Sequence, residues 1–111
     1  MTTATATRTN IHNLGSIERI PPGEGRTFVV HGESIAVFRG RDGRAFATQA
    51  KCPHREGPLA DGLMGGDTVV CPLHAYKFRL SDGAAIGHDC GTLTTYRTWQ
   101  DDVGTVWLET G

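Results

Sequence analysis

Two Cys/His pairs carry the chemistry that this sequence offers. Cys52 and His54 lie in "CPH", Cys71 and His74 lie in "CPLH", and sixteen residues separate the pairs. Thiolate and imidazole are soft and borderline metal ligands, so four of them in a short stretch predict a metal centre. Two kinds of centre use two Cys and two His. One is a structural zinc site, and the other is a [2Fe–2S] cluster with two thiolates on one iron and two imidazoles on the other.

The spacing favours the two-iron centre. Zinc sites of this size usually begin with two cysteines on one knuckle, and their histidines are paired later in the chain. Here each segment supplies one Cys and one His, so each segment can contact both irons. Pro53 and Pro72 follow the two cysteines and stiffen both segments. We therefore expect one cluster per chain on these four ligands, and a structural zinc-binding interaction protein is the alternative.

The segments "CPHREGPLADG" and "CPLHAYKFRLSDG" resemble the signature of the Rieske-type [2Fe–2S] ferredoxins. The resemblance runs from about residue 11 to residue 108. It implies an all-β fold, a Rieske-like antiparallel β-sandwich with two cluster-binding loops. It also implies that Cys52 and Cys71 bind the inner iron, and that His54 and His74 bind the outer iron.

Together with "CGTLTTY", the two segments look most like the small subunit of assimilatory NAD(P)H nitrite reductase. That resemblance implies a large sirohaem and flavin subunit as the redox partner. An open alternative is a Rieske ferredoxin that takes electrons from a ferredoxin reductase and passes them to the terminal oxygenase of an aromatic-ring dioxygenase. In either case the chain is an electron-transfer component, and it contains no candidate substrate site.

The second loop departs from that of high-potential Rieske proteins, which resembles C-P-C-H-G-S-x-Y. Leu73 stands at the middle cysteine, Tyr76 at the serine and Phe78 at the tyrosine. Fewer hydrogen bonds to the cluster sulfurs stabilise the reduced state less. We therefore expect a potential at the low end of the Rieske range, which spans roughly −150 to +300 mV. Cys90 is expected to be a packed thiol without a ligand role.

Composition excludes several other classes of function. The chain has 111 residues, enough for one domain, and its 11 basic and 12 acidic residues leave no surplus of charge for nucleic acid or an anionic membrane. The N-terminus lacks the apolar core of a signal peptide, and no stretch is long enough to span a bilayer. We expect a cytoplasmic protein with a disordered tail at residues 1–10 and a Rieske domain at residues 11–111.

Short β-branched and aromatic runs alternate with Gly/Asp turns, a pattern typical of antiparallel strands. The sequence predicts a meander over 26–30, 34–39 and 44–50, strands in "DTVVC" and "YKFRL", and a closing hairpin of 92–99 with 105–109. A single helical turn in "SIERI" should end at the following Pro-Pro pair. No motif includes His12, His31 or His88. The expected core contains five aromatic residues: Phe28, Phe38, Phe46, Trp99 and Trp107.

Overall fold

The computed structural model describes residues 10–52, 58–72, 76–87 and 91–110. In chain order, its elements are β1 (Ile11–Ser16), η1 (Ile17–Arg19, a 3₁₀ turn), β2 (Glu24–Val30), β3 (Glu33–Arg39), β4 (Ala45–Gln49), η2 (Leu59–Asp61, a second 3₁₀ turn), β5 (Leu63–Gly65), β6 (Thr68–Val70), β7 (Lys77–Arg79), β8 (Ala85–Ile86), β9 (Thr95–Gln100) and β10 (Thr105–Glu109). All the pairings among these strands are antiparallel.

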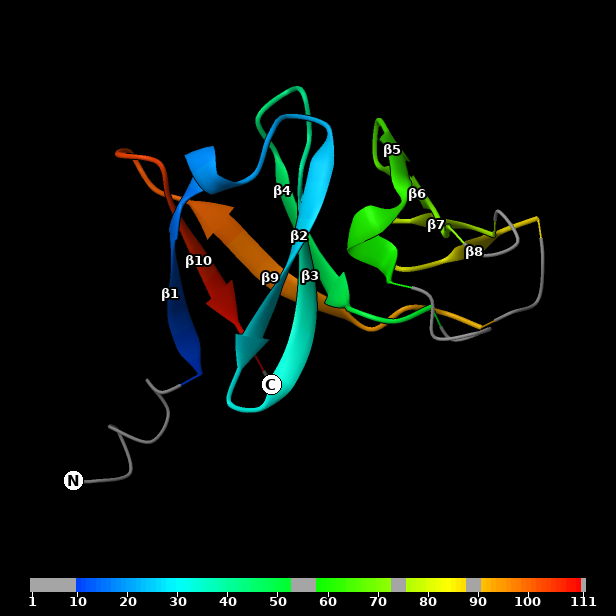
Figure 1. Ribbon diagram of the computed structural model, residues 1–111, viewed down its shortest axis with the longest axis horizontal. Coiled ribbons are helices and arrows are strands. Elements are labelled where there is room, and N and C mark those ends of the chain that lie inside the picture. Colours follow the sequence, from blue (N-terminus) through cyan, green and yellow to red (C-terminus); the bar gives the residue numbers. More distant parts are fainter. Residues whose placement is uncertain (1–9, 53–57, 73–75, 88–90, 111) are drawn as a thin grey trace.

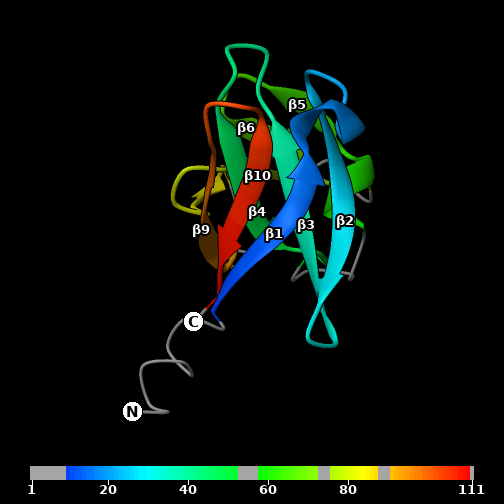
Figure 2. The same cartoon turned by 90° about the vertical axis from the view of Figure 1, so that its left-hand side faces the viewer.

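The larger sheet has six strands in the order β1-β10-β9-β4-β3-β2. It curls so that its two edge strands, β1 and β2, lie on the same side of the molecule (Figures 1 and 2). Leu14 from β1 and Val30 from β2 therefore contribute to one core together with Val106 and Leu108 from β10. This core fills the inside of the curled sheet. The opposite face of the sheet packs against the smaller sheet.

The smaller sheet has four strands in the order β5-β6-β7-β8 and lies beside the larger one (Figure 1). Strand β3 forms a wall between the two units, because side chains alternate across a strand. Ile35 and Val37 belong to the core of the larger sheet. Ala36 and Phe38 point the other way and belong to a second core shared with the smaller sheet. All four are fully buried, so β3 is covered on both faces.

The larger sheet packs closely against η2 at strand β2. A Cβ placed on Gly25 would lie 2.7 Å from the ring of Phe38 and 3.3 Å from the Cα of Ala60. Real Cβ atoms essentially never approach another atom to 2.7 Å, so a side chain at this position would force the Phe38 ring or the backbone to shift. Gly25 is buried, and its missing side chain lets the backbone of β2 pack against the segment that leads out of the first cysteine loop.

Most of the expected strands are confirmed. The meander forms as β2, β3 and β4, the closing hairpin as β9 and β10, and the helical turn as η1. The sequence did not predict β1, near the start of the chain, which pairs with β10, near its end. It was wrong to place Trp99 and Trp107 in the core. Val106 and Leu108 point inward from β10, so Trp107 between them points outward, where its indole donates to Asp101 at 3.0 Å.

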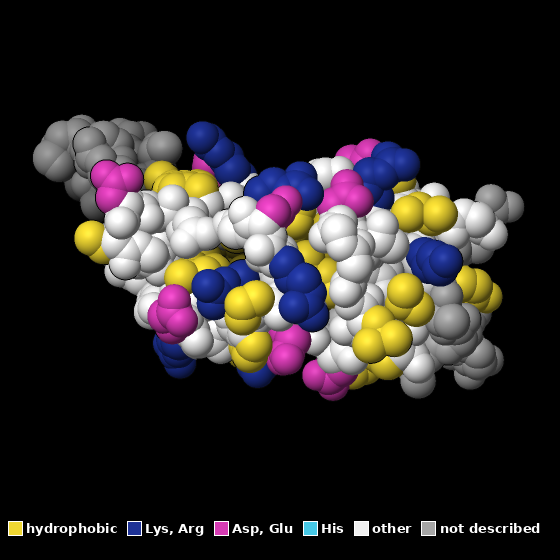
Figure 3. All heavy atoms as spheres, turned by 90° about the horizontal axis from the view of Figure 1, so that it is seen from above, with side chains coloured by type: hydrophobic (Ala, Val, Ile, Leu, Met, Phe, Trp, Pro, Cys, Tyr) yellow, Lys and Arg dark blue, Asp and Glu magenta, His cyan; other side chains and the backbone are white. Residues whose placement is uncertain are grey.

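The surface agrees with the balanced composition. Basic and acidic side chains are interspersed on the face that Figure 3 shows, and neither sign forms a continuous field. No helix in the described ranges is both long enough and apolar enough to cross a bilayer.

We expect Gly25→Ala to lower the free energy of unfolding by about 1–3 kcal/mol, because the added methyl group must displace the Phe38 ring or η2. The matched control is Gly65→Ala in β5, where an added Cβ meets nothing within 4 Å. That change should stay within about 0.5 kcal/mol of the wild type. Urea unfolding followed by tryptophan fluorescence measures both. Equal effects of the two substitutions would contradict the close approach at Gly25.

Candidate metal centre

Cys52 lies at the point where the chain leaves the end of β4. Its side chain is 0% exposed. The backbone closes the base of the loop that follows: Leu59 N donates to the carbonyl of Ala50 at 2.9 Å, and Lys51 forms an isolated β-bridge with Pro58. The residues on the two sides of the first loop are therefore hydrogen-bonded to each other, and these contacts hold the backbone next to Cys52.

Cys71 directly follows β6 and is 1% exposed. The second loop has an equivalent closure, because the N–H of Cys71 donates to the carbonyl of Tyr76 at 2.7 Å. Tyr76 is half-buried and packs against the buried core that contains Cys71. Both loops thus begin with a buried cysteine and are tied at the base by a backbone hydrogen bond.

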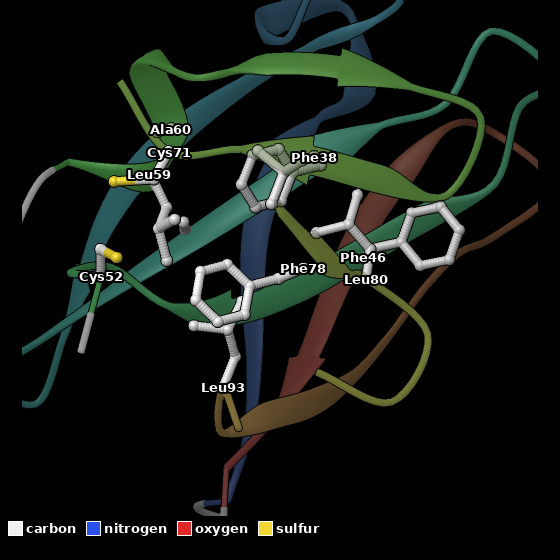
Figure 4. Close-up of a cluster of buried hydrophobic side chains, with 11 residues drawn as sticks. Phe38, Phe46, Cys52, Leu59, Ala60, Cys71, Phe78, Leu80 and Leu93 are labelled. Carbon is white, nitrogen blue, oxygen red and sulfur yellow. The ribbon is translucent and has the colours of Figure 1, made fainter. Parts of the chain in front are cut away.

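The two cysteines belong to one cluster of buried side chains, which also contains Leu59, Phe78 and Leu93. Figure 4 shows both sulfur atoms at the same edge of this cluster, away from Phe38 and Phe46. A lone buried cysteine is usually a small hydrophobic residue. Two thiols that reach one edge from separate loops are a donor set suited to a single iron, and the apolar wall behind them excludes water.

A third segment, which contains Leu93, also contributes to this core. Leu93 is buried, and its N–H donates to the carbonyl of Gly83 at 2.8 Å. Gly83 has φ +77°, and a Cβ there would clash with the Leu93 carbonyl. The turn before it is ordered by Asp82, which accepts from Ala84 N at 3.0 Å and from Arg79 at 2.9 Å. Both bonds hold the pKa of the Asp82 carboxyl below its usual value, and the bond from the backbone N–H of Ala84 contributes more than the bond from Arg79.

Of the four predicted ligands, the structure brings Cys52 and Cys71 together, and His54 and His74 lie outside the described residues. Cys90 also lies outside them. The described part of the chain accordingly contains no group of three or more potential metal ligands. Phe78, whose missing hydroxyl the sequence singled out, is fully buried in the same cluster as the two cysteines.

The sequence did not predict the contact that Gly83 makes with Leu93. It also missed Gly62, where a Cβ would clash with the carbonyl of Val70. Both glycines permit close backbone packing against a segment that follows eight or ten residues later. A glycine in the sequence indicates a turn or a close approach, but the partner becomes visible only in the fold.

The family model for the Rieske [2Fe–2S] domain matches residues 10–97, which include both loops and their connecting strands. The chain belongs to this family. Rieske domains bind a [2Fe–2S] cluster, so the cofactor is an iron–sulfur cluster rather than structural zinc, and the chain is a Rieske-type electron carrier. The antiparallel β-fold expected from the resemblance is confirmed.

Similar proteins come from two redox systems. The "Biphenyl dioxygenase ferredoxin subunit" of Pseudomonas sp. (strain KKS102) is 39% identical over 69 residues, which are 61% of this chain and 62% of that protein. The NMR structure of the Escherichia coli protein NirD has a TM-score of 0.79 and 29% identity, covering 90% of this chain and 96% of that one. A crystal structure described as the small subunit of an NADPH nitrite reductase has a TM-score of 0.81 and 26% identity, covering 90% and 98%.

Curated relatives extend well beyond the matched region. The chain spans 14%, 17% and 62% of the length of three of them. All these proteins share the cluster-binding domain and its fold. The similarities therefore show that the chain is an electron carrier, and they do not identify the redox system in which it works.

We call the core that contains Cys52, Cys71 and Phe78 the cluster-side core. We expect Gly83→Ala to lower the free energy of unfolding by at least about 2 kcal/mol, because the left-handed φ and the contact with Leu93 both oppose a side chain. Gly87→Ala is the matched control: it has φ +80° and nothing within 4 Å of an added Cβ. That variant should lose only the conformational term, about 1 kcal/mol. Urea unfolding and iron content measure both variants. A Gly83 variant no worse than the Gly87 variant would contradict the packing role.

Proposed function

We propose that the chain is the electron-carrying small subunit of an assimilatory nitrite reductase, and that Cys52, His54, Cys71 and His74 bind its cluster. The observation that supports the system is a similarity covering nearly the full length of both chains to a structure described as a nitrite reductase small subunit. The loop sequences, including "CGTLTTY", favour the same group.

The chain's own residues would bind and shield the cofactor. When bound, a Rieske cluster accepts and donates one electron at a time. The buried thiols of Cys52 and Cys71 would hold the inner iron at the edge of the apolar core. Leu59, Leu93 and Phe78 line that core and exclude water from the sulfur side. The imidazoles of the two histidines would complete the coordination of the outer iron.

A second candidate is a Rieske ferredoxin that reduces a terminal oxygenase. It is favoured by the 39% identity with a dioxygenase ferredoxin subunit. The same fold and the same ligands serve both systems, so the partner separates them. The expected cytoplasmic location stays a prediction in either case.

Replacing each proposed ligand by alanine, one at a time, tests the ligand set. All four variants should lack the red-brown colour and the low-average-g EPR signal that dithionite produces in a Rieske protein. Cys90→Ser is the control, and it should keep both the colour and a full content of iron. A coloured protein after loss of any of the four residues, or a colourless Cys90 variant, would contradict this assignment.

The partner is tested with the tagged, cluster-loaded protein. Purification from cells grown on nitrite should recover a large sirohaem flavoprotein, and that protein together with nitrite should reoxidise the dithionite-reduced chain. Recovery of an oxygenase, with reoxidation by oxygenase and aromatic substrate instead, would overturn the nitrite reductase proposal in favour of the ferredoxin.

The reduction potential should fall at the low end of the range of roughly −150 to +300 mV, because Phe78 offers no hydroxyl to the cluster. Phe78→Tyr should raise the potential, and the buried hydroxyl should cost about 1–3 kcal/mol of stability if it finds no partner. Phe46→Tyr is the control, since Phe46 belongs to the same core but lies away from the two sulfurs (Figure 4). Protein-film voltammetry measures all three proteins. A wild-type potential near the top of the range would contradict the inference.

A further inference from the structure

The last hydrogen-bonded pair between β4 and β9 is made partly by a side chain. Thr48 pairs with Thr95, so Gln49 comes opposite Thr94. The N–H of Gln49 donates to the carbonyl of Thr94 at 2.9 Å, as in a regular ladder. The return bond differs, because the N–H of Thr94 donates to the side-chain Oε1 of Gln49 at 2.8 Å. In a regular antiparallel pair the backbone carbonyl would accept it.

The backbone carbonyl of Gln49 has another donor. The hydroxyl of Thr48 donates to it at 2.8 Å, and Thr48 is itself completely buried. A buried hydroxyl needs a hydrogen-bond partner, and this carbonyl supplies it. The side chain of Gln49 thus supplies the oxygen for the last pairing with β9.

The other end of the same amide reaches the first cysteine loop. Gln49 Nε2 donates to the carbonyl of Lys51 at 2.7 Å. Lys51 directly precedes Cys52, and Thr94 directly follows Leu93. Cys52 and Leu93 are both buried in the cluster-side core. One amide therefore connects the chain before the first cysteine to the segment that contributes Leu93 to the same core.

Gln49 also lies where the chain changes partner. Before it, β4 pairs with β9; after it, Ala50 accepts from Leu59 N at 2.9 Å, and Lys51 bridges to Pro58. The strand must leave the larger sheet here in order to bring Cys52 to the core. An amide is suited to this position because it accepts and donates at once, and the two bonds of opposite polarity fix its orientation.

We propose that Gln49 is a positioning residue for the iron–sulfur cluster: its side-chain amide ties the Cys52 loop to the segment at Leu93 and so holds the Cys52 thiolate at the iron. The inference rests on the proposed role of Cys52 as a ligand. Without the amide, the segment at Lys51 loses its tie to the segment at Leu93. The sulfur then samples a wider range of positions.

Two substitutions separate the two hydrogen bonds. Gln49→Ala removes both of them. Gln49→Glu keeps an acceptor for Thr94 N but offers no donor to the Lys51 carbonyl. Gln100→Ala is the matched control, because Gln100 is a half-buried glutamine at the other end of β9, and its Nε2 donates to a single backbone carbonyl, that of Gly43.

The experiment measures the rate at which an iron chelator removes the cluster, well below the unfolding temperature of every variant, and the EPR spectrum of the reduced protein. One net hydrogen bond corresponds to about fivefold in an equilibrium. We expect cluster loss to be about fivefold faster in Gln49→Glu, which loses one bond, and on the order of 25-fold faster in Gln49→Ala, which loses both, with broadened EPR lines in both variants. Gln100→Ala should stay within about twofold of the wild type and keep its spectrum.

If Gln49→Ala and Gln49→Glu release the cluster no faster than Gln100→Ala and give the wild-type spectrum, the positioning role is overturned and Gln49 is only a strand residue. Should Gln49→Ala fail to fold, the comparison of Gln49→Glu with Gln100→Ala decides. Cys52→Ala is measured in parallel. A wild type with two irons and a Cys52→Ala variant with none leave the ligand assignment intact whatever the Gln49 variants do, so the two proposals fail separately.

Discussion

The arrangement of this protein depends on one requirement: two thiols from different parts of the chain must meet at one edge of an apolar core without admitting water. Cys52 and Cys71 are separated by a 3₁₀ turn and two strands, and both are nearly inaccessible to solvent. A buried polar or ligating group is tolerated when its surroundings satisfy it and hold it in place. The smaller sheet, the loop closures and the third segment all contribute to holding these two residues.

The larger sheet supplies rigidity at a distance from the cysteines. Its curled form gives it a core of its own, and β3 contributes side chains both to that core and to the cluster-side core. A shift of β3 by one residue would exchange its two faces, so that Ala36 and Phe38 would enter the core that Ile35 and Val37 now fill. The register of β3 therefore fixes where Phe38 lies, and through Phe38 it fixes the approach of β2 and η2.

Close approaches at glycines, together with one side-chain amide, join the segments around the cysteines. Gly25, Gly62 and Gly83 each lie where another part of the chain leaves no room for a Cβ. At Gln49, where a regular backbone pair would have kept β4 in the larger sheet, a side-chain amide makes the connection instead. The family resemblance explains what such a core is for, and the similarities to nitrite reductase small subunits and dioxygenase ferredoxins show that one scaffold serves different partners.

The sequence by itself determined the chemistry and the class of fold. Four ligands of two types, Cys and His, at a characteristic spacing predict a two-iron centre, because coordination chemistry constrains residue type and local separation, and both are visible in a linear chain. The β-branched and aromatic runs between Gly/Asp turns likewise predicted β2, β3 and β4, because these residue types favour strands. Tertiary structure decided the rest. The pairing of β1 with β10, the outward orientation of Trp107, the contact of Gly83 with Leu93 and the double role of Gln49 all depend on which distant segment lies alongside. Local propensity and spacing carry no information about that choice.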